Sequence, residues 1–171
     1  MQFYDKRMKD TIVWEIEKKE LKKLLKGAFD EQKYLFDKYY KKQLVEMYGN
    51  DRKGWLTGML LAIIDEYGEY ERMEDTWEKI YELVDVLHFI IQMAIISNVS
   101  YNRFMKLLED DSRVGELRSA VQLWLKGLID DVELTERVWV DFIKKAGDLL
   151  AVLYRHHIKA KENERRQKEG Y

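Results

Sequence analysis

The sequence predicts an all-α protein, a bundle of about five to six helices around a four-helix-type core. Proline is absent from the 171 residues and glycine occurs nine times, so helices can run long and loops are few. Apolar residues recur three and four positions apart along most of the chain, which places them on one face of a helix. Because no repeat or linker divides the chain, we expect a single domain over residues 1–171.

The composition excludes several classes of protein. Hydrophobic residues make up 46% of the chain, enough for a substantial core, and the formal net charge is only −2. This balance lacks the basic surface of a nucleic-acid-binding protein. The absence of cysteine excludes disulfides and thiolate chemistry. The longest apolar run, 86–96, is too short to span a membrane. Without a signal-peptide pattern at the N-terminus, we expect a cytoplasmic protein that binds neither membranes nor nucleic-acid polymers.

The first half of the chain predicts three long helices. Residues 1–14 form an extension of uncertain structure. An amphipathic stripe predicts a helix over 15–42. Gly and Asn-Asp chemistry predicts a loop over 47–55, and helices follow at 56–73 and 77–97.

The second half begins with a break at 97–100, where Ser100 is expected to cap a short helix over 101–109. A turn region and a helix near 113–129 come next. After 130–133, an apolar stripe that includes Trp139 and Leu153 predicts one long helix continuing past residue 160. Its sustained apolar face indicates packing against other helices, either of the same chain or also of a second chain.

Two pairs of acidic residues carry the chemistry. Glu66 and Glu69 are three residues apart, as are Glu82 and Asp85, so each pair shares a helix face. The flanking residues are apolar, and charged groups near an apolar face need compensation. Four converging carboxylates favour a hard cation such as Mg²⁺, which prefers oxygen ligands. The alternative is a pair of solvated acidic faces. A di-iron site is disfavoured because only Asp85 and His88 approximate the Glu-x-x-His motif that it needs.

The acidic motif resembles that of a known superfamily. Glu66-x-x-Glu69, twelve residues and Glu82-x-x-Asp85 resemble the signature of the all-α nucleoside triphosphate pyrophosphohydrolases, which include MazG-like proteins and dimeric dUTPases. Three further stretches resemble the dimeric dUTPases: "LVDVLHF" at 83–89, the Gln-containing "FDEQKYLFDKYY", and the C-terminal motif of Lys159, Asn163, Arg166, Gln167, Gly170 and Tyr171.

The resemblance implies a homodimer that hydrolyses dUTP, with dUDP as a further candidate substrate and Mg²⁺ as cofactor. The products of dUTP would be dUMP and pyrophosphate. Glu66, Glu69, Glu82 and Asp85 would hold the metal, and Glu69 would also orient or deprotonate the attacking water. Lys159, Asn163 and Arg166 would bind the phosphates, since they share one helix face. Residues 159–171 would form a phosphate-binding lid, mobile until the nucleotide arrives because nothing in the segment gives it a reason to pack.

The resemblance also suggests base-binding residues. Gln32 interrupts an apolar stripe, and its amide matches the edge of uracil; an internal hydrogen bond to another helix is the alternative. His88 would line the same pocket or be a core residue. Trp77 would be a stacking wall.

The twelve-residue interval is closer to MazG-like members. Hydrolysis of another nucleotide, dCTP or a modified dNTP, is therefore the alternative within enzymes. A non-catalytic helical interaction module is the alternative outside them.

Overall fold

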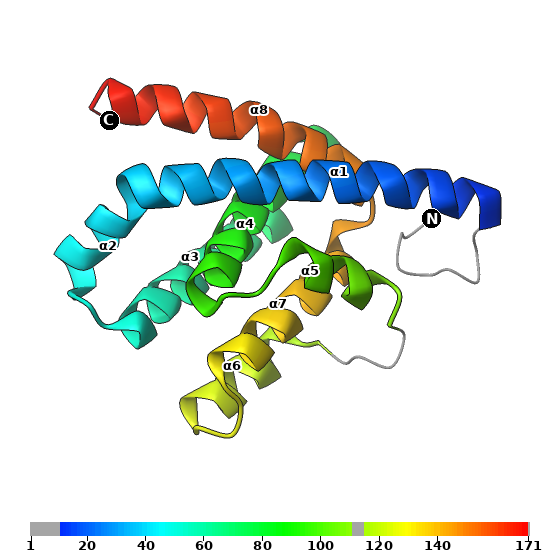
Figure 1. The fold of residues 1–171 in the computed structure, drawn as a ribbon. Coiled ribbons are helices and arrows are strands. Elements are labelled where there is room, and N and C mark those ends of the chain that lie inside the picture. Colours follow the sequence, from blue (N-terminus) through cyan, green and yellow to red (C-terminus); the bar gives the residue numbers. More distant parts are fainter. Residues whose placement is uncertain (1–10, 111–114, 171) are drawn as a thin grey trace.

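The computed structural model describes residues 11–110 and 115–170, with side chains from residue 15 onward. Helices dominate this described part and it contains no β-strand, which confirms the all-α prediction. The elements are α1 (Thr11–Leu35), the π-helical segment η2 (Phe36–Tyr40), α2 (Lys41–Tyr48), α3 (Arg52–Arg72), α4 (Thr76–Ser97), α5 (Tyr101–Leu108), α6 (Leu117–Leu125), α7 (Asp131–Ala146) and α8 (Leu149–Lys168) (Figure 1). This is more segments than the five to six expected.

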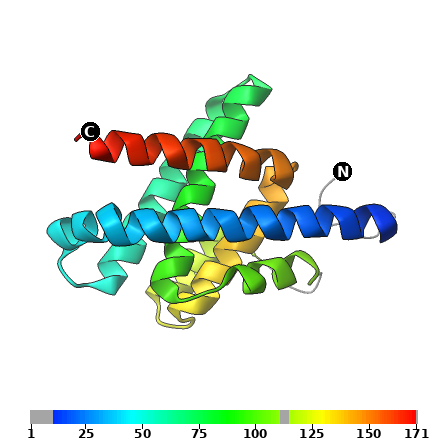
Figure 2. The same ribbon diagram turned by 45° about the horizontal axis from the view of Figure 1, so that its top comes forward.

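The helices form two groups around α4. Helices α1 and α8 lie side by side and run in the same direction, and the hairpin of α3 and α4 crosses beneath them (Figure 2). Helix α7 also packs on α4, α6 packs on α7, and α5 packs on α1 and α7. Helix α4 therefore contacts α1, α3, α7 and α8 and occupies the centre of the fold.

Helix α4 is a core helix. Within the described residues, it is the helix long and apolar enough to cross a membrane by length and composition. In its most apolar 18-residue window, 61% of residues are buried inside the protein. The apolar run at 86–96 is thus accounted for by packing against the neighbouring helices.

Several helix starts follow the capping chemistry of the sequence. The Ser100 side chain accepts a hydrogen bond from the backbone N–H of Arg103 at 3.2 Å, so the predicted cap of α5 is confirmed. Asp75 caps α4 by accepting from the N–H groups of Trp77 and Glu78.

The loop predicted over 47–55 is shorter than expected. Only residues 49–51 separate α2 from α3, because Asp51 caps α3 directly.

The single long C-terminal helix predicted after residue 133 is wrong. Gly147 adopts φ +66°, a conformation that ends α7, and the Asp148 side chain caps α8 by accepting from the N–H of Ala151. The chain changes direction between the two helices.

Two other boundaries also differ from expectation. The helix expected near 113–129 is shorter, Leu117–Leu125, and residues 113 and 114 lie outside the described part. Helix α1 begins at Thr11, within the extension expected over 1–14, and residues 1–10 lie outside the described part.

The π-helical segment η2 interrupts the helical repeat between α1 and α2. Neither end shows a side-chain cap, and the backbone stays helical from α1 through η2 into α2. A π-helix closes its hydrogen bonds one residue later than an α-helix does, so it changes the direction in which the following side chains point. Tyr40, Gln43 and Leu44, at and just after this segment, line a cavity.

Candidate functional site

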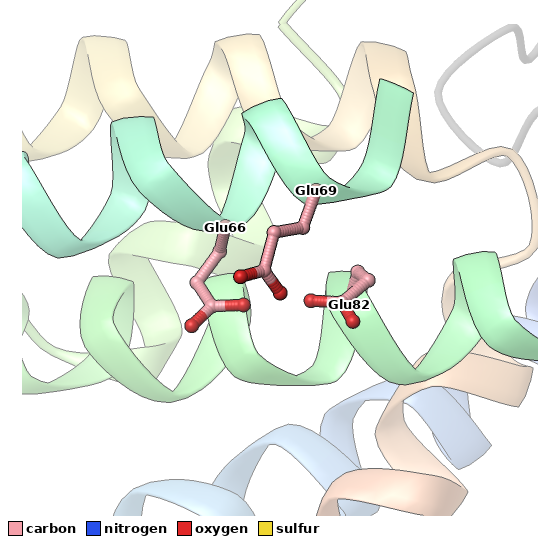
Figure 3. A group of neighbouring side chains, drawn as sticks. All are labelled: Glu66, Glu69 and Glu82. Atoms are coloured by element: carbon pink, nitrogen blue, oxygen red, sulfur yellow. The ribbon is translucent and has the colours of Figure 1, made fainter. Parts of the chain in front are cut away.

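The α3–α4 hairpin brings the acidic residues together. Glu66 and Glu69 come from α3 and Glu82 comes from the facing turns of α4. One carboxylate oxygen from each lies within 4.8 Å of the others. Figure 3 shows the three side chains pointing toward one another across the space between the two helices. The predicted convergence of the acidic pairs is therefore confirmed for these three residues.

Asp85, the fourth predicted ligand, has a different partner. It lies about one turn further along α4 than Glu82 and is outside that three-carboxylate group. Its Oδ1 instead contacts Nζ of Lys159 on α8, in an ion pair whose side chains are 25% and 32% exposed, respectively. Asp85 and Glu66 nevertheless line one cavity.

Mutual repulsion and burial disfavour the charged state of these carboxylates. Burial, followed by the neighbouring carboxylates Glu82, Asp85 and Glu69, raises the pKa of Glu66 to about 8. The charge of Glu82 is the largest cause of the raised pKa of Glu69. Burial raises the pKa of Asp85, although Lys159 opposes the shift. The cluster thus needs protons or a cation at neutral pH.

The donor set fits a hard divalent cation. Glu66 Oε2 and Glu82 Oε2 are buried and have no hydrogen-bond partner within the described part of the protein. Unpaired buried carboxylate oxygens are costly, and Mg²⁺ takes oxygen ligands while retaining several waters. Oxygens of this kind, converging from two helices, are suitable ligands for Mg²⁺.

A cavity of about 380 Å³ opens beside the carboxylates. Five of the predicted site residues line it: Glu66, Asp85, His88, Lys159 and Asn163. The other lining residues were not predicted to belong to a site. They come mainly from α2, α3 and α4: Tyr40, Gln43, Leu44, Met47, Met59, Phe89 and Gln92. Among these residues, only Gln92 could have been singled out from the sequence, because it is a polar residue within the apolar run at 86–96.

Helix α8 supplies polar side chains to the lining of the cavity. Lys159 and Asn163 are four residues apart and both line the cavity, as their shared helix face predicts. Arg166 is exposed and its guanidinium pairs with Glu162 at 3.2 Å, outside the cavity lining. Gln167 accepts a hydrogen bond from the Gln43 amide at 2.8 Å. The chain turns at Gly170, with φ +84°, and Tyr171 lies outside the described residues.

The expectation that residues 159–171 have no reason to pack is wrong for 159–168. These residues continue α8, and Ala160 is buried. The Tyr34 hydroxyl of α1 donates to Glu164 at 3.2 Å. Such partners are more than a hundred residues away in sequence, so local composition could not reveal them. Closure over a bound nucleotide remains a prediction.

The predicted base-binding residues lie in different surroundings. Gln32 is fully buried, and its Nε2 lies 3.4 Å from Nε2 of His88. Gln32 is not among the cavity-lining residues. Its observed contact is the alternative prediction, an internal contact with another helix. His88 lines the cavity, and its Nε2 is also 2.9 Å from Nε2 of Gln92. Burial lowers the pKa of His88 to about 3, so the imidazole is neutral, and an unprotonated Nε2 can accept one hydrogen bond, for which the Gln92 amide is the nearer donor.

The interpretation of Trp77 as a stacking wall is not supported. Its side chain is 59% exposed in the first turn of α4, and the Arg155 guanidinium lies 5.0 Å from its ring centroid. Because α4 begins at the far end of the hairpin, its first turn cannot reach the cavity lined by residues further along the helix.

Comparison of the chain with protein-family models, curated proteins and solved structures gave no match. The function is therefore inferred from the residues of the site and their geometry.

Proposed function

We propose that the protein is a Mg²⁺-dependent nucleoside triphosphate pyrophosphohydrolase that acts on dUTP, and on dUDP, as a cytoplasmic homodimer. The observation that carries the proposal is the convergence of Glu66, Glu69 and Glu82 beside a cavity that Lys159 and Asn163 also line. A phosphate chain needs both parts, a site for the cation and donors for its oxygens.

The carboxylates divide into two roles. Glu66, Glu82 and Asp85 would hold Mg²⁺, which supplies charge neutralisation of the phosphates and activation of water. Glu69 would orient the attacking water and accept its proton, because its carboxylate converges with those of Glu66 and Glu82, which would hold the cation. Water adds to a phosphorus atom, the P–O bond to the pyrophosphate breaks, and dUTP yields dUMP and pyrophosphate.

The cationic wall would bind the phosphate oxygens. Lys159 offers a compact positive charge and Asn163, one turn later, offers an amide donor to the same cavity. Arg166 would join them by leaving Glu162, its exposed partner. Exposed ion pairs of this kind contribute little stability, so exchanging the carboxylate for a phosphate costs little.

The apolar part of the cavity would receive the base. Leu44, Met47, Met59 and Phe89 form an apolar surface, and the amides of Gln43 and Gln92 line the same cavity. An amide offers one acceptor and two donors, which suits the donor and acceptor pattern of a uracil edge. Trp77 and Gln32 have no direct part in this arrangement.

The proposal is tested with a panel of deoxynucleoside triphosphates and Mg²⁺. We expect dUTP to give dUMP and pyrophosphate with the highest kcat/KM. A preference for dCTP or a modified dNTP would change the substrate assigned to the protein and leave the proposed reaction unchanged. Turnover of no nucleotide would reject the enzymatic function and favour a helical interaction module.

Glu69→Gln sharpens the test. We expect a loss of at least 100-fold in kcat, on the order of a removed general base, with an unchanged circular dichroism spectrum. Glu71→Gln is the matched control, because Glu71 is exposed on the same helix and faces a different cavity. Equal activity of the Glu69→Gln variant and the control would show that Glu69 does not activate the attacking water.

A further inference from the structure

The contact between Lys159 and Asp85 places a cation of the protein itself on a predicted metal ligand. Lys159 Nζ lies against Asp85 Oδ1, although the two residues come from different helices, α8 and α4. The three carboxylates that converge on one another are Glu66, Glu69 and Glu82. Asp85 thus has its charge compensated from within the protein, while Glu66 and Glu82 each keep a buried oxygen without a partner.

Lys159 and a divalent cation would be in conflict at Asp85. Mg²⁺ binds carboxylate oxygens at about 2.0–2.1 Å and demands a regular arrangement of ligands. An ammonium group on the same carboxylate repels the ion and occupies space that its ligands or waters need. The pair is also partly shielded from solvent, where such repulsion is screened less than at the surface.

We propose that Lys159 competes with the divalent cation for Asp85, and that the phosphate chain of the nucleotide relieves this competition by drawing the ammonium group away. The inference rests on the proposed function, since it concerns the same site. The lysine side chain is long and flexible, and Lys159 itself lines the cavity, as does Asn163 one turn further along α8. Its ammonium group can therefore turn from Asp85 to a phosphate in the cavity without any movement of the helix.

This arrangement couples the two ligands. Metal alone must displace Lys159 and binds weakly, whereas metal with nucleotide finds Asp85 free. By linkage, the nucleotide strengthens metal binding by the same factor as the metal strengthens nucleotide binding. The protein would hold its full set of metal ligands only when a substrate with phosphates is present.

The test measures Mn²⁺ and Mg²⁺ binding by calorimetry, without nucleotide, for the wild type and Lys159→Met. We expect Lys159→Met to bind metal about 5- to 10-fold more tightly, at the lower end of typical coupling factors. Lys161→Met is the matched control: it removes the same charge from the same helix, but Lys161 is exposed and lines a different cavity, with Glu31 and Glu164. Its metal affinity should equal that of the wild type.

Repeating the titration with a nonhydrolysable dUTP analogue completes the test. The analogue should tighten metal binding to the wild type much more than to Lys159→Met. Equal metal affinity of all three proteins overturns the competition and leaves the proposed function standing. Metal binding by none of them overturns the proposed function itself. Lys159→Gln replaces Lys159→Met if the latter does not fold.

Discussion

Gln43 at α2 donates a hydrogen bond to Gln167 near the end of α8, across 124 positions of sequence and at 2.8 Å. Gln43 also lines the cavity, so this contact joins the cavity wall to the C-terminal end of the protein. The last turns of α8 are otherwise held to α1 by the contact of Tyr34 with Glu164. The last turns of α8 thus depend on a few exposed polar contacts.

Gln43→Ala should loosen the end of α8. Removing the amide donor leaves Gln167 without this partner, and exposed contacts of this kind define regions of low local stability. We expect amide hydrogen exchange at residues 164–168 to become several-fold faster, with little change in the overall free energy of unfolding. Gln122→Ala, at an exposed position on α6, is the control and should leave exchange in α8 unchanged. Unchanged exchange in both variants would contradict the role of Gln43.

Glu66→Gln should stabilise the metal-free protein at high pH. The pKa of Glu66 is about 8 in the folded state against an ordinary 4.5. Between these values the folded state holds more protons than the unfolded state, so this group makes stability fall as pH rises from 4.5 to 8, and the loss levels off above 8. We expect a gain of about 1–2 kcal/mol at pH 9 and almost none at pH 4, well below the full value of the shift because water screens a partly exposed side chain.

Urea unfolding of the wild type and Glu66→Gln at the two pH values, in EDTA, measures this difference. Adding Mg²⁺ should then stabilise the wild type more than the variant. A variant less stable than the wild type at pH 9 in EDTA would show that the carboxylate cluster is not repulsive.

Gly147→Ala should destabilise the fold. Gly147 adopts φ +66° at the end of α7, and a side chain at such a backbone angle costs about 1–2 kcal/mol. The matched control is Gly27→Ala, because Gly27 lies inside α1 and an added Cβ there would meet no atom within 4 Å. That change should stabilise the protein by about 0.5–1 kcal/mol. Urea unfolding should therefore give opposite signs for the two variants, and equal signs would contradict the break between α7 and α8.

The protein should be a homodimer in solution. Several large apolar side chains are more than half exposed, among them Leu61 on α3 and Leu125 at the end of α6. Burying such surface is a main source of association free energy. Light scattering should give a mass near twice that of the 20.7 kDa chain, and a mass near one chain would contradict the expectation.

The sequence was most informative where the determinants are local. The spacing of Glu66 and Glu69 within α3 was enough to place two carboxylates on one side of a helix. The Ser100 cap was also readable, because its bonding partner is three residues away. The break at Gly147 and Asp148 had a comparable signal, a glycine followed by a capping residue. The apolar stripe that continues on both sides of the break concealed it.

Contacts between distant segments could not be predicted from the sequence. Nothing near Lys159 indicates that its partner is Asp85, since that contact depends on how α8 crosses α4. The exposed position of Trp77 likewise follows from where the hairpin begins relative to the cavity. The order of residues in a motif did not determine which of them meet in space.

The π-helical segment Phe36–Tyr40 sets the direction in which one wall of the cavity points. Each residue of an α-helix turns the chain by about 100°. A π-helical turn holds more residues than an α-helical turn, so each residue of this segment turns the chain less and the segment accommodates about one extra residue. Deleting a single residue within it would restore the ordinary repeat and leave Gln43, Leu44 and Met47 facing the cavity. Rewinding the segment as an α-helix at its present length would instead turn these three side chains away.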